Sequence, residues 1–166
     1  MNANMRIGHG YDVHRFAEQF LPDKPLVLAG VTLPVEKSLL AHSDGDLVLH
    51  ALADAILGAV GKGDIGLHYP DSDPSIAGMA STEILAKILA MAASDGYTLV
   101  NLDITVIAQV PKLAPYRDAM VASLAGLTGL DRHAVNLKAT TTEGLGAIGR
   151  ELGIACNAVV LMQGNA

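Results

Sequence analysis

The chain contains a single cysteine, Cys156, among its 166 residues. One cysteine excludes disulfide bonds within the chain, and its place in an apolar run predicts a buried core thiol. Charged residues make up only 17% of the sequence, against a typical share of about 25%. Because so few charges are available to cover the surface, we expect part of that surface to be buried against other subunits.

Further absences narrow the class of protein. No Lys/Arg cluster interrupts the formal net charge of -6, so nucleic acid is not an expected partner. No apolar stretch is long enough to span a membrane, and residues 1–4 have neither the basic start nor the apolar middle of a signal peptide. The expected compartment is therefore the cytoplasm. An anionic substrate would have to be attracted by a metal ion, a few placed cations and backbone amides.

The residue patterns predict an α/β fold of the α+β type. We expect residues 1–166 to form one domain with a loose leader at 1–4, built as a sandwich of a mixed sheet with helices on one face. The predicted strands are 6–16, 98–109, 135–142 and 154–162, with a hairpin at 26–33 that turns near Ala29 and Gly30. The predicted helices are 81–94, 115–127 and one that begins after a cap at Ser43 or Asp44 and ends near Gly61.

Asp12, His14 and His50 form the leading candidate site. Asp12 and His14 are two residues apart on a predicted strand, so their side chains share one face. His50 lies in an apolar-periodic stretch, 47–60, that predicts a helix. A strand carrying a carboxylate and an imidazole, facing a helix that carries a second imidazole, can supply three ligands to a zinc-like ion and leave the fourth position open. The alternative is three polar residues with unrelated hydrogen bonds.

The start of that helix holds more candidates. Asp46 lies four residues before His50, where it could orient the His50 ring or act only as an N-terminal helix acid. Ser43 and Asp46 also resemble a capping box. His42 and Ser43 precede the helix, whose free amides attract phosphate. The alternative is that Ser43 merely caps the helix and His42 is solvated.

Three polar segments lie elsewhere in the chain. Residues 63–74 hold three acids within a long predicted loop, 63–78, where they could bind sugar or polyol hydroxyls or simply form turns. Residues 108–112 end a strand with a proline and the cation Lys112. Residues 140–143 end another strand with hydroxyls and an acid, which suits phosphate and divalent metals; the alternatives there are β-propensity and turn formation. The chain has no Walker P-loop, G-x-S-x-G or H-E-x-x-H motif.

Together these segments resemble one family, the 2-C-methyl-D-erythritol 2,4-cyclodiphosphate synthases of the non-mevalonate isoprenoid pathway. The resemblance runs from about Met5 to Met162, and the order and spacing of five motifs make it specific. The matching segments are Arg6–His14, Leu40–Asp46 with His50, Gly63–Gly66 with Pro70–Pro74, Ala108–Gln109 with Pro111–Lys112, and Lys138–Glu143.

The resemblance implies a homotrimer with active sites between subunits. It implies one zinc ion per subunit at Asp12, His14 and His50, with a substrate phosphate oxygen as fourth ligand. Glu143 would hold a second divalent ion, magnesium or manganese, on the substrate diphosphate. His42 and Thr141 are the expected catalytic residues, supporting the transition state. The expected substrate-binding residues are Asp12, His14, His42, Ser43, Asp64, Ile65, Gly66, Tyr69, Pro70, Asp71, Ser72, Asp73, Ala108, Gln109, Val110, Pro111, Lys112, Leu113, Ala114, Thr140, Thr141, Thr142, Glu143, Ala147 and Arg150.

The implied reaction cyclises 4-diphosphocytidyl-2-C-methyl-D-erythritol 2-phosphate and releases CMP. The alternatives are a zinc phosphohydrolase that uses metal-bound hydroxide and a non-catalytic nucleotide-binding subunit. One departure from the family pattern concerns Glu151-Leu152-Gly153, where the family commonly has an acid–glycine pair directly before the Ile-Ala of the last strand. This change bears on the binding of isoprenoid diphosphates in a cavity that the family has on the trimer axis near the equivalent of Arg150, and leaves the metal and phosphate residues untouched.

Overall fold

The computed structural model describes residues 4–70 and 78–165. A five-stranded mixed sheet has the order β4-β1-β7-β5-β6, in which β5 and β6 run parallel and the other neighbours run antiparallel. A separate hairpin pairs β2 with β3. The strands are β1 (Asn4–Phe16), β2 (Val27–Leu28), β3 (Val31–Thr32), β4 (Leu39–Leu40), β5 (Tyr97–Ile107), β6 (Val135–Thr140) and β7 (Gly153–Gly164).

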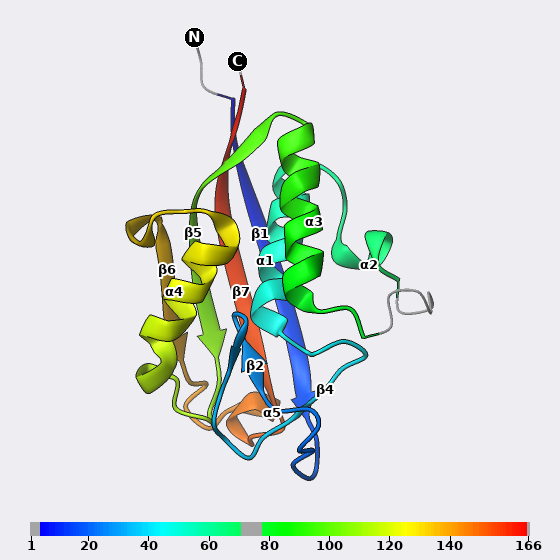
Figure 1. Cartoon of the computed structure of the whole chain (residues 1–166). Helices are drawn as coiled ribbons and strands as arrows, with labels where there is room; N and C mark the ends of the chain where they lie inside the picture. Colours follow the sequence, from blue (N-terminus) through cyan, green and yellow to red (C-terminus); the bar gives the residue numbers. More distant parts are fainter. Residues whose placement is uncertain (1–3, 71–77, 166) are drawn as a thin grey trace.

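Helices cover one face of this sheet (Figure 1). Helix α1 lies on β1 and β7, α3 packs on α1, and α4 packs on β6. The α-helices are α1 (Leu47–Ala59), α2 (Ile65–His68), α3 (Ser81–Ser94), α4 (Arg117–Thr128) and α5 (Gly146–Gly149), with 3-10 turns at Ala114–Tyr116 and Arg132–Ala134. The predicted fold class, a mixed sheet with helices, is confirmed. Among the described residues, no helix combines the length and apolarity that a membrane crossing requires.

The local predictions succeed where pattern and turn chemistry agree. The hairpin turns at Ala29 and Gly30, whose φ angles of 55° and 75° suit a two-residue turn. Cys156 is buried, and burial raises the pKa of its thiol.

The strand predicted to reach Thr142 instead ends at Thr140, because the chain turns there and the Thr142 carbonyl accepts a hydrogen bond from Leu145 N at 2.9 Å. Helices α2 and α5, four residues each, and strand β4, two residues long, are too short for periodicity to predict.

Two glycines let α1 lie directly on the backbone of β1. A Cβ atom on Gly8 would stand 1.7 Å from the Ala55 carbonyl oxygen, and one on Gly10 would stand 1.9 Å from that of Ala51. Any larger residue would push the helix off the strand. Gly8 and Gly10 share a face with Asp12 and His14, since side chains alternate along a strand. The close packing therefore aims the first turn of α1 at those two side chains.

Asp46, and not Ser43 or Asp44, is the N-cap of α1, which corrects the predicted cap. Its carboxylate accepts hydrogen bonds from the backbone N–H groups of Leu49 (3.2 Å), Ala29 (2.9 Å) and Gly30 (2.6 Å). Burial raises the pKa of Asp46 to about 6, so the group is ionised at neutral pH. The predicted capping box is absent, because Ser43 Oγ accepts from Gly45 N instead. Asp46 thus joins the hairpin to the helix.

Replacing Asp46 by asparagine should lower the free energy of unfolding by about 2–4 kcal/mol. Asparagine keeps one acceptor oxygen, so its NH₂ group would face either Gly30 N–H or the other two amides, and a buried donor would lose its partner. Urea unfolding at one protein concentration measures the change. Asp131→Asn is the matched control, since the Asp131 side chain caps no helix. Equal stability of the two variants would show that the buried carboxylate is dispensable.

Candidate active site

Asp12, His14 and His50 converge at the end of β1 nearest to β4. Asp12 Oδ2 lies 3.0 Å from His14 Nε2 and 3.1 Å from His50 Nδ1, and the two ring nitrogens are 3.3 Å apart. All three side chains are partly buried. Within residues 4–70 and 78–165, they are the one group of three or more such side chains close enough to hold a metal ion.

These separations fit a tetrahedral ion. Ligand atoms about 2.0–2.1 Å from a zinc-like ion stand about 3.3 Å from one another in tetrahedral geometry. One carboxylate oxygen and two imidazole nitrogens are also a donor set that zinc accepts. Three acceptor atoms packed against one another would otherwise need protons between them. The residues present therefore fit the implied metal ion.

Ionisation of the three side chains is coupled. Burial by itself raises the pKa of Asp12, but the hydrogen bonds and charges of His14 and His50 outweigh it and hold that pKa below its ordinary value. Burial lowers the pKa of His50, whereas the Asp12 carboxylate raises it more, so the net direction is upward. Asp12 therefore stays ionised and gives the cluster the negative charge that attracts a cation.

The second nitrogen of the His50 ring also has defined neighbours. Ser81 Oγ lies 2.9 Å from His50 Nε2, and Ser43 Oγ lies 3.4 Å from the same atom. The Asp46 carboxylate makes its hydrogen bonds to backbone amides and not to the ring. Of the two roles considered for Asp46, the structure therefore supports an acid at the helix N-terminus and not an orienting partner of His50. The sequence prediction missed Ser81, because nothing near it in the sequence links it to a histidine 31 residues earlier.

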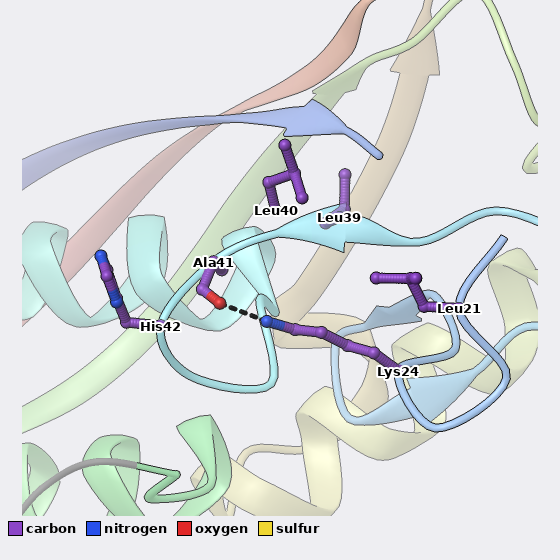
Figure 2. A pocket seen from close by; sticks show the side chains of 6 residues that line it. All are labelled: Leu21, Lys24, Leu39, Leu40, Ala41 and His42. Atoms are coloured by element: carbon purple, nitrogen blue, oxygen red, sulfur yellow. Dashed lines mark hydrogen bonds between the residues drawn. The ribbon is translucent and has the colours of Figure 1, made fainter. Parts of the chain in front are cut away.

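His42 lies at one side of a pocket of about 340 Å³, and the next residue, Ser43, contacts the His50 ring. The pocket is lined by Leu21, Lys24, Leu39, Leu40, Ala41 and His42 (Figure 2). Lys24 donates a hydrogen bond to the Ala41 carbonyl oxygen, which anchors the chain just before His42. His42 itself is exposed, and Ser43 is half-buried. Of the two predicted phosphate residues, Ser43 therefore contacts the metal cluster through His50, and His42 precedes it in the chain.

The two polar strand ends meet at the same edge of the sheet. Ile107 pairs with Thr140 across the parallel β5–β6 ladder, and Ala108 N donates to Thr140 O at 2.9 Å. Gly144 N also lies 3.4 Å from Gln109 Oε1. The loop residues 108–114 and 140–143 are thus neighbours. Thr141 Oγ1 contacts Glu143 Oε1 at 3.3 Å, and both side chains are exposed at this edge.

Strand registers place the metal cluster at that same edge. His14 pairs with Ile154 on β7, and the next residue of β7, Ala155, pairs with Ile107 on β5. Strands in a sheet lie about 4.8 Å apart, so the ends of β5 and β6 stand about 10–14 Å from β1. Within one chain, the metal residues and the loops 108–114 and 140–143 therefore lie at the same end of the sheet, but they are separated across the strands by about 10–14 Å.

The remaining predicted residues flank these groups. Asp64 caps α2 by accepting from Leu67 N at 2.9 Å, and Asp54 on α1 accepts from Ile65 N at 2.7 Å. Gly66, Tyr69 and Pro70 belong to the same segment, whereas Asp71, Ser72 and Asp73 lie outside the described residues. Ala147 is in α5, and Arg150 is exposed directly after it.

Comparison with known proteins gives a consistent result. The sequence model of the YgbB family matches residues 5–163. The chain is 56% identical over 158 residues to the 2-C-methyl-D-erythritol 2,4-cyclodiphosphate synthase of Geobacillus kaustophilus, covering 95% of the chain and 98% of that relative. It superposes on the CDP complex of IspF from Plasmodium falciparum with a TM-score of 0.85 at 33% identity, covering 100% of both chains. The bifunctional IspDF of Campylobacter jejuni matches 99% of this chain with a TM-score of 0.92 at 43% identity, and the match spans 43% of that protein.

Proposed function

The chain belongs to the YgbB family of 2-C-methyl-D-erythritol 2,4-cyclodiphosphate synthases, and we propose that it performs their cyclisation beside a zinc ion held by Asp12, His14 and His50. The observation that carries this assignment is the convergence of the three donors at 3.0–3.3 Å. Three protein ligands leave a fourth position for a substrate phosphate oxygen. When bound, the ion supplies charge neutralisation for the phosphate groups.

The reaction needs little acid or base chemistry. An oxygen of the substrate 2-phosphate attacks the β-phosphorus, a new P–O–P bond forms, and the bond from the β-phosphorus to the bridging oxygen breaks. CMP leaves with that oxygen and its electron pair, and no water is consumed. The nucleophile is already an anion and the leaving group is a phosphate. Positioning of the two groups can therefore supply much of the effect, roughly 7–11 kcal/mol.

The chain's residues hold these anions in line. His42 and Ser43 bind the phosphate of the methylerythritol half, next to the metal cluster. The cytidine half is bound at the ends of β5 and β6, by residues 108–114, which include Lys112, and by residues 140–142. Thr141 and His42 donate to the phosphate groups as charge gathers in the transition state. Glu143, exposed beside Thr141, is the ligand for a second divalent ion, magnesium or manganese, on the diphosphate.

We also propose a homotrimer with its active sites shared between subunits. The sheet face opposite the helices exposes a band of apolar side chains: Met5, Ile7, Tyr11, Val13 and Val159. A band of this kind on an uncovered sheet face favours burial against another copy of the chain. A metal-bound diphosphate is shorter than the 10–14 Å estimated between the two halves within one chain. A neighbouring subunit that supplies the cytidine loops would remove that gap.

Incubation with substrate in ¹⁸O-labelled water tests the reaction. Cyclisation should release CMP and give a cyclic diphosphate that contains no ¹⁸O from water. A zinc phosphohydrolase would instead give a linear product with one ¹⁸O atom, and a nucleotide-binding subunit would give neither product. Metal analysis of the same sample should find one zinc ion per subunit. Either a labelled linear product or an unchanged substrate would overturn the proposal.

The two halves of the pocket should respond differently to mutation. Lys112→Ala should weaken CMP binding about 10-fold, because an exposed charged contact to phosphate is lost. His42→Ala should leave CMP affinity within about twofold yet slow turnover about 100-fold, because its contact is needed in the transition state. Calorimetry with CMP, beside turnover assays, measures both. If His42→Ala lost as much CMP affinity as Lys112→Ala, this division of the pocket would be wrong.

A further inference from the structure

We propose that Ser81 and Asp44 are positioning residues of the metal site, which fix the tautomer of His50 so that its Nδ1 atom presents a lone pair to the ion. This inference rests on the proposed metal-binding role of His50. Neither residue contacts the Asp12 or His14 ligand atoms, and neither is among the metal-binding or substrate-binding residues expected from the sequence. Both act through the distal nitrogen of the His50 ring.

A continuous hydrogen-bond chain joins the three residues. Asp44 Oδ1 accepts from the hydroxyl of Ser81 in a short contact, and Asp44 Oδ2 accepts from Ser81 N at 3.0 Å. Ser81 Oγ lies 2.9 Å from His50 Nε2. Ser81 is only 1% exposed, so water has little access to compete for these groups. The carboxylate holds Ser81 through both its hydroxyl and its amide.

The direction of the protons follows from the chemistry of the groups. An ionised carboxylate only accepts hydrogen bonds, so the single hydroxyl proton of Ser81 must point to Asp44. Ser81 Oγ then has only lone pairs left for the ring, and His50 Nε2 must carry the proton that it shares with Ser81. A neutral imidazole protonated on Nε2 has its free lone pair on Nδ1. Nδ1 is the atom that faces Asp12 Oδ2 and His14 Nε2.

Ser43 is a weaker partner for the same nitrogen. Its Oγ atom lies 3.4 Å from His50 Nε2 and already accepts from Gly45 N at 3.2 Å. Ser81 is nearer and is held by a carboxylate, which strengthens its hydroxyl as an acceptor. We therefore assign the larger part of the effect to Ser81. This position also explains why the first residue of α3 is a buried serine packed against the start of α1.

Loss of the Ser81 hydroxyl should favour the other tautomer of His50, in which Nδ1 carries the proton. Asp12 Oδ2 stands 3.1 Å from His50 Nδ1 and would accept a proton carried there. With no acceptor of equal strength at Nε2, the ring would favour the Nδ1–H form, in which the metal-binding lone pair is occupied. Zinc affinity should then fall about 10–100-fold, the usual cost of removing a hydrogen-bond partner behind a metal-bound histidine.

The experiment measures the tautomer and the metal affinity separately. In ¹⁵N-histidine-labelled, zinc-free protein at a pH where the His50 ring is neutral, the nitrogen shifts should show His50 protonated on Nε2, with the signals assigned by their absence in His50→Ala. Ser81→Ala should shift His50 toward Nδ1–H and weaken zinc binding in chelator competition. Ser81→Thr, which keeps the hydroxyl, should restore both. Ser38→Ala is the matched control: Ser38 is also 1% exposed and hydrogen-bonded, but its partners are the Leu21 backbone groups.

The outcomes separate this inference from the proposed function. An Nδ1–H tautomer in the wild-type protein, or wild-type zinc affinity and tautomer in Ser81→Ala, would overturn the role of Ser81. Equal loss of zinc affinity in Ser38→Ala would show a general effect of disturbing buried serines and would likewise overturn it. If the wild-type protein bound no zinc, or if His50→Ala kept its zinc, the metal assignment itself would fail.

Discussion

Replacing His50 by alanine should abolish binding of the proposed zinc ion and lower the cyclisation rate at least about 1,000-fold, since charge stabilisation by a metal ion is worth several kcal/mol. Alanine leaves two ligands, Asp12 and His14, on one strand, and two ligands do not hold a zinc ion in a tetrahedral site. Metal analysis after dialysis and a CMP-release assay on the same sample would measure the two losses together.

The control for this variant is His133→Ala. His133 is exposed in the 3-10 turn at 132–134, away from the cluster, so its removal should change neither zinc content nor turnover. Circular dichroism should show both variants folded. Retention of zinc in His50→Ala would refute the assignment of the metal site, and loss of zinc without loss of activity would restrict the ion to a structural role.

Replacing Ile7 by glutamate should dissociate the proposed trimer and reduce cyclisation at least about 100-fold, the factor that corresponds to about 3 kcal/mol. Ile7 is 75% exposed within one chain, so the substitution does not disturb the fold of the subunit. In the assembly it would bury an unpaired carboxylate in each subunit, which costs about 3–5 kcal/mol per copy. Light scattering at micromolar concentration reports the mass of the particle.

Ala86→Glu is the matched control, because Ala86 is exposed on the helix layer at the opposite side of the sheet. The same added charge there should leave a trimer of full activity. Unfolding curves recorded at several protein concentrations should depend on concentration for the wild type but not for Ile7→Glu. A wild-type protein that runs as a monomer, or an Ile7→Glu variant that remains a trimer, would rule out the apolar band as the interface.

Periodicity in the sequence predicted the metal cluster because each ligand obeys a local rule. The two-residue spacing of Asp12 and His14 places both on one strand face, and the apolar pattern around His50 predicts its helix. The same rules predicted the long strands, the hairpin turn at Ala29 and Gly30, and helices at 81–94 and 115–127, which the structure has at Ser81–Ser94 and Arg117–Thr128. These elements are long enough, or their turn residues specific enough, for local physics to decide them.

The partners of Asp46 and His50 could not be predicted in this way. The spacing left two roles open for Asp46, at the helix start or beside His50, but it did not indicate the amides of the hairpin 16 and 17 residues earlier in the chain to which Asp46 binds. Ser81 reaches His50 only because α3 packs on α1. Contacts of this kind depend on tertiary packing, which neither spacing nor propensity encodes.

Because α1 packs directly on Gly8 and Gly10, the relative positions of Asp12, His14 and His50 are set by folding of the chain and not by metal binding. Backbone contacts between strand and helix decide where His50 stands relative to Asp12, whether or not an ion is present. In zinc fingers, by contrast, the metal drives folding, and chelators unfold the domain. Here the ion should be exchangeable. The metal-free protein would stay folded and would bind zinc again. It would also bind cobalt or manganese at the same three side chains, which makes the site accessible to spectroscopy.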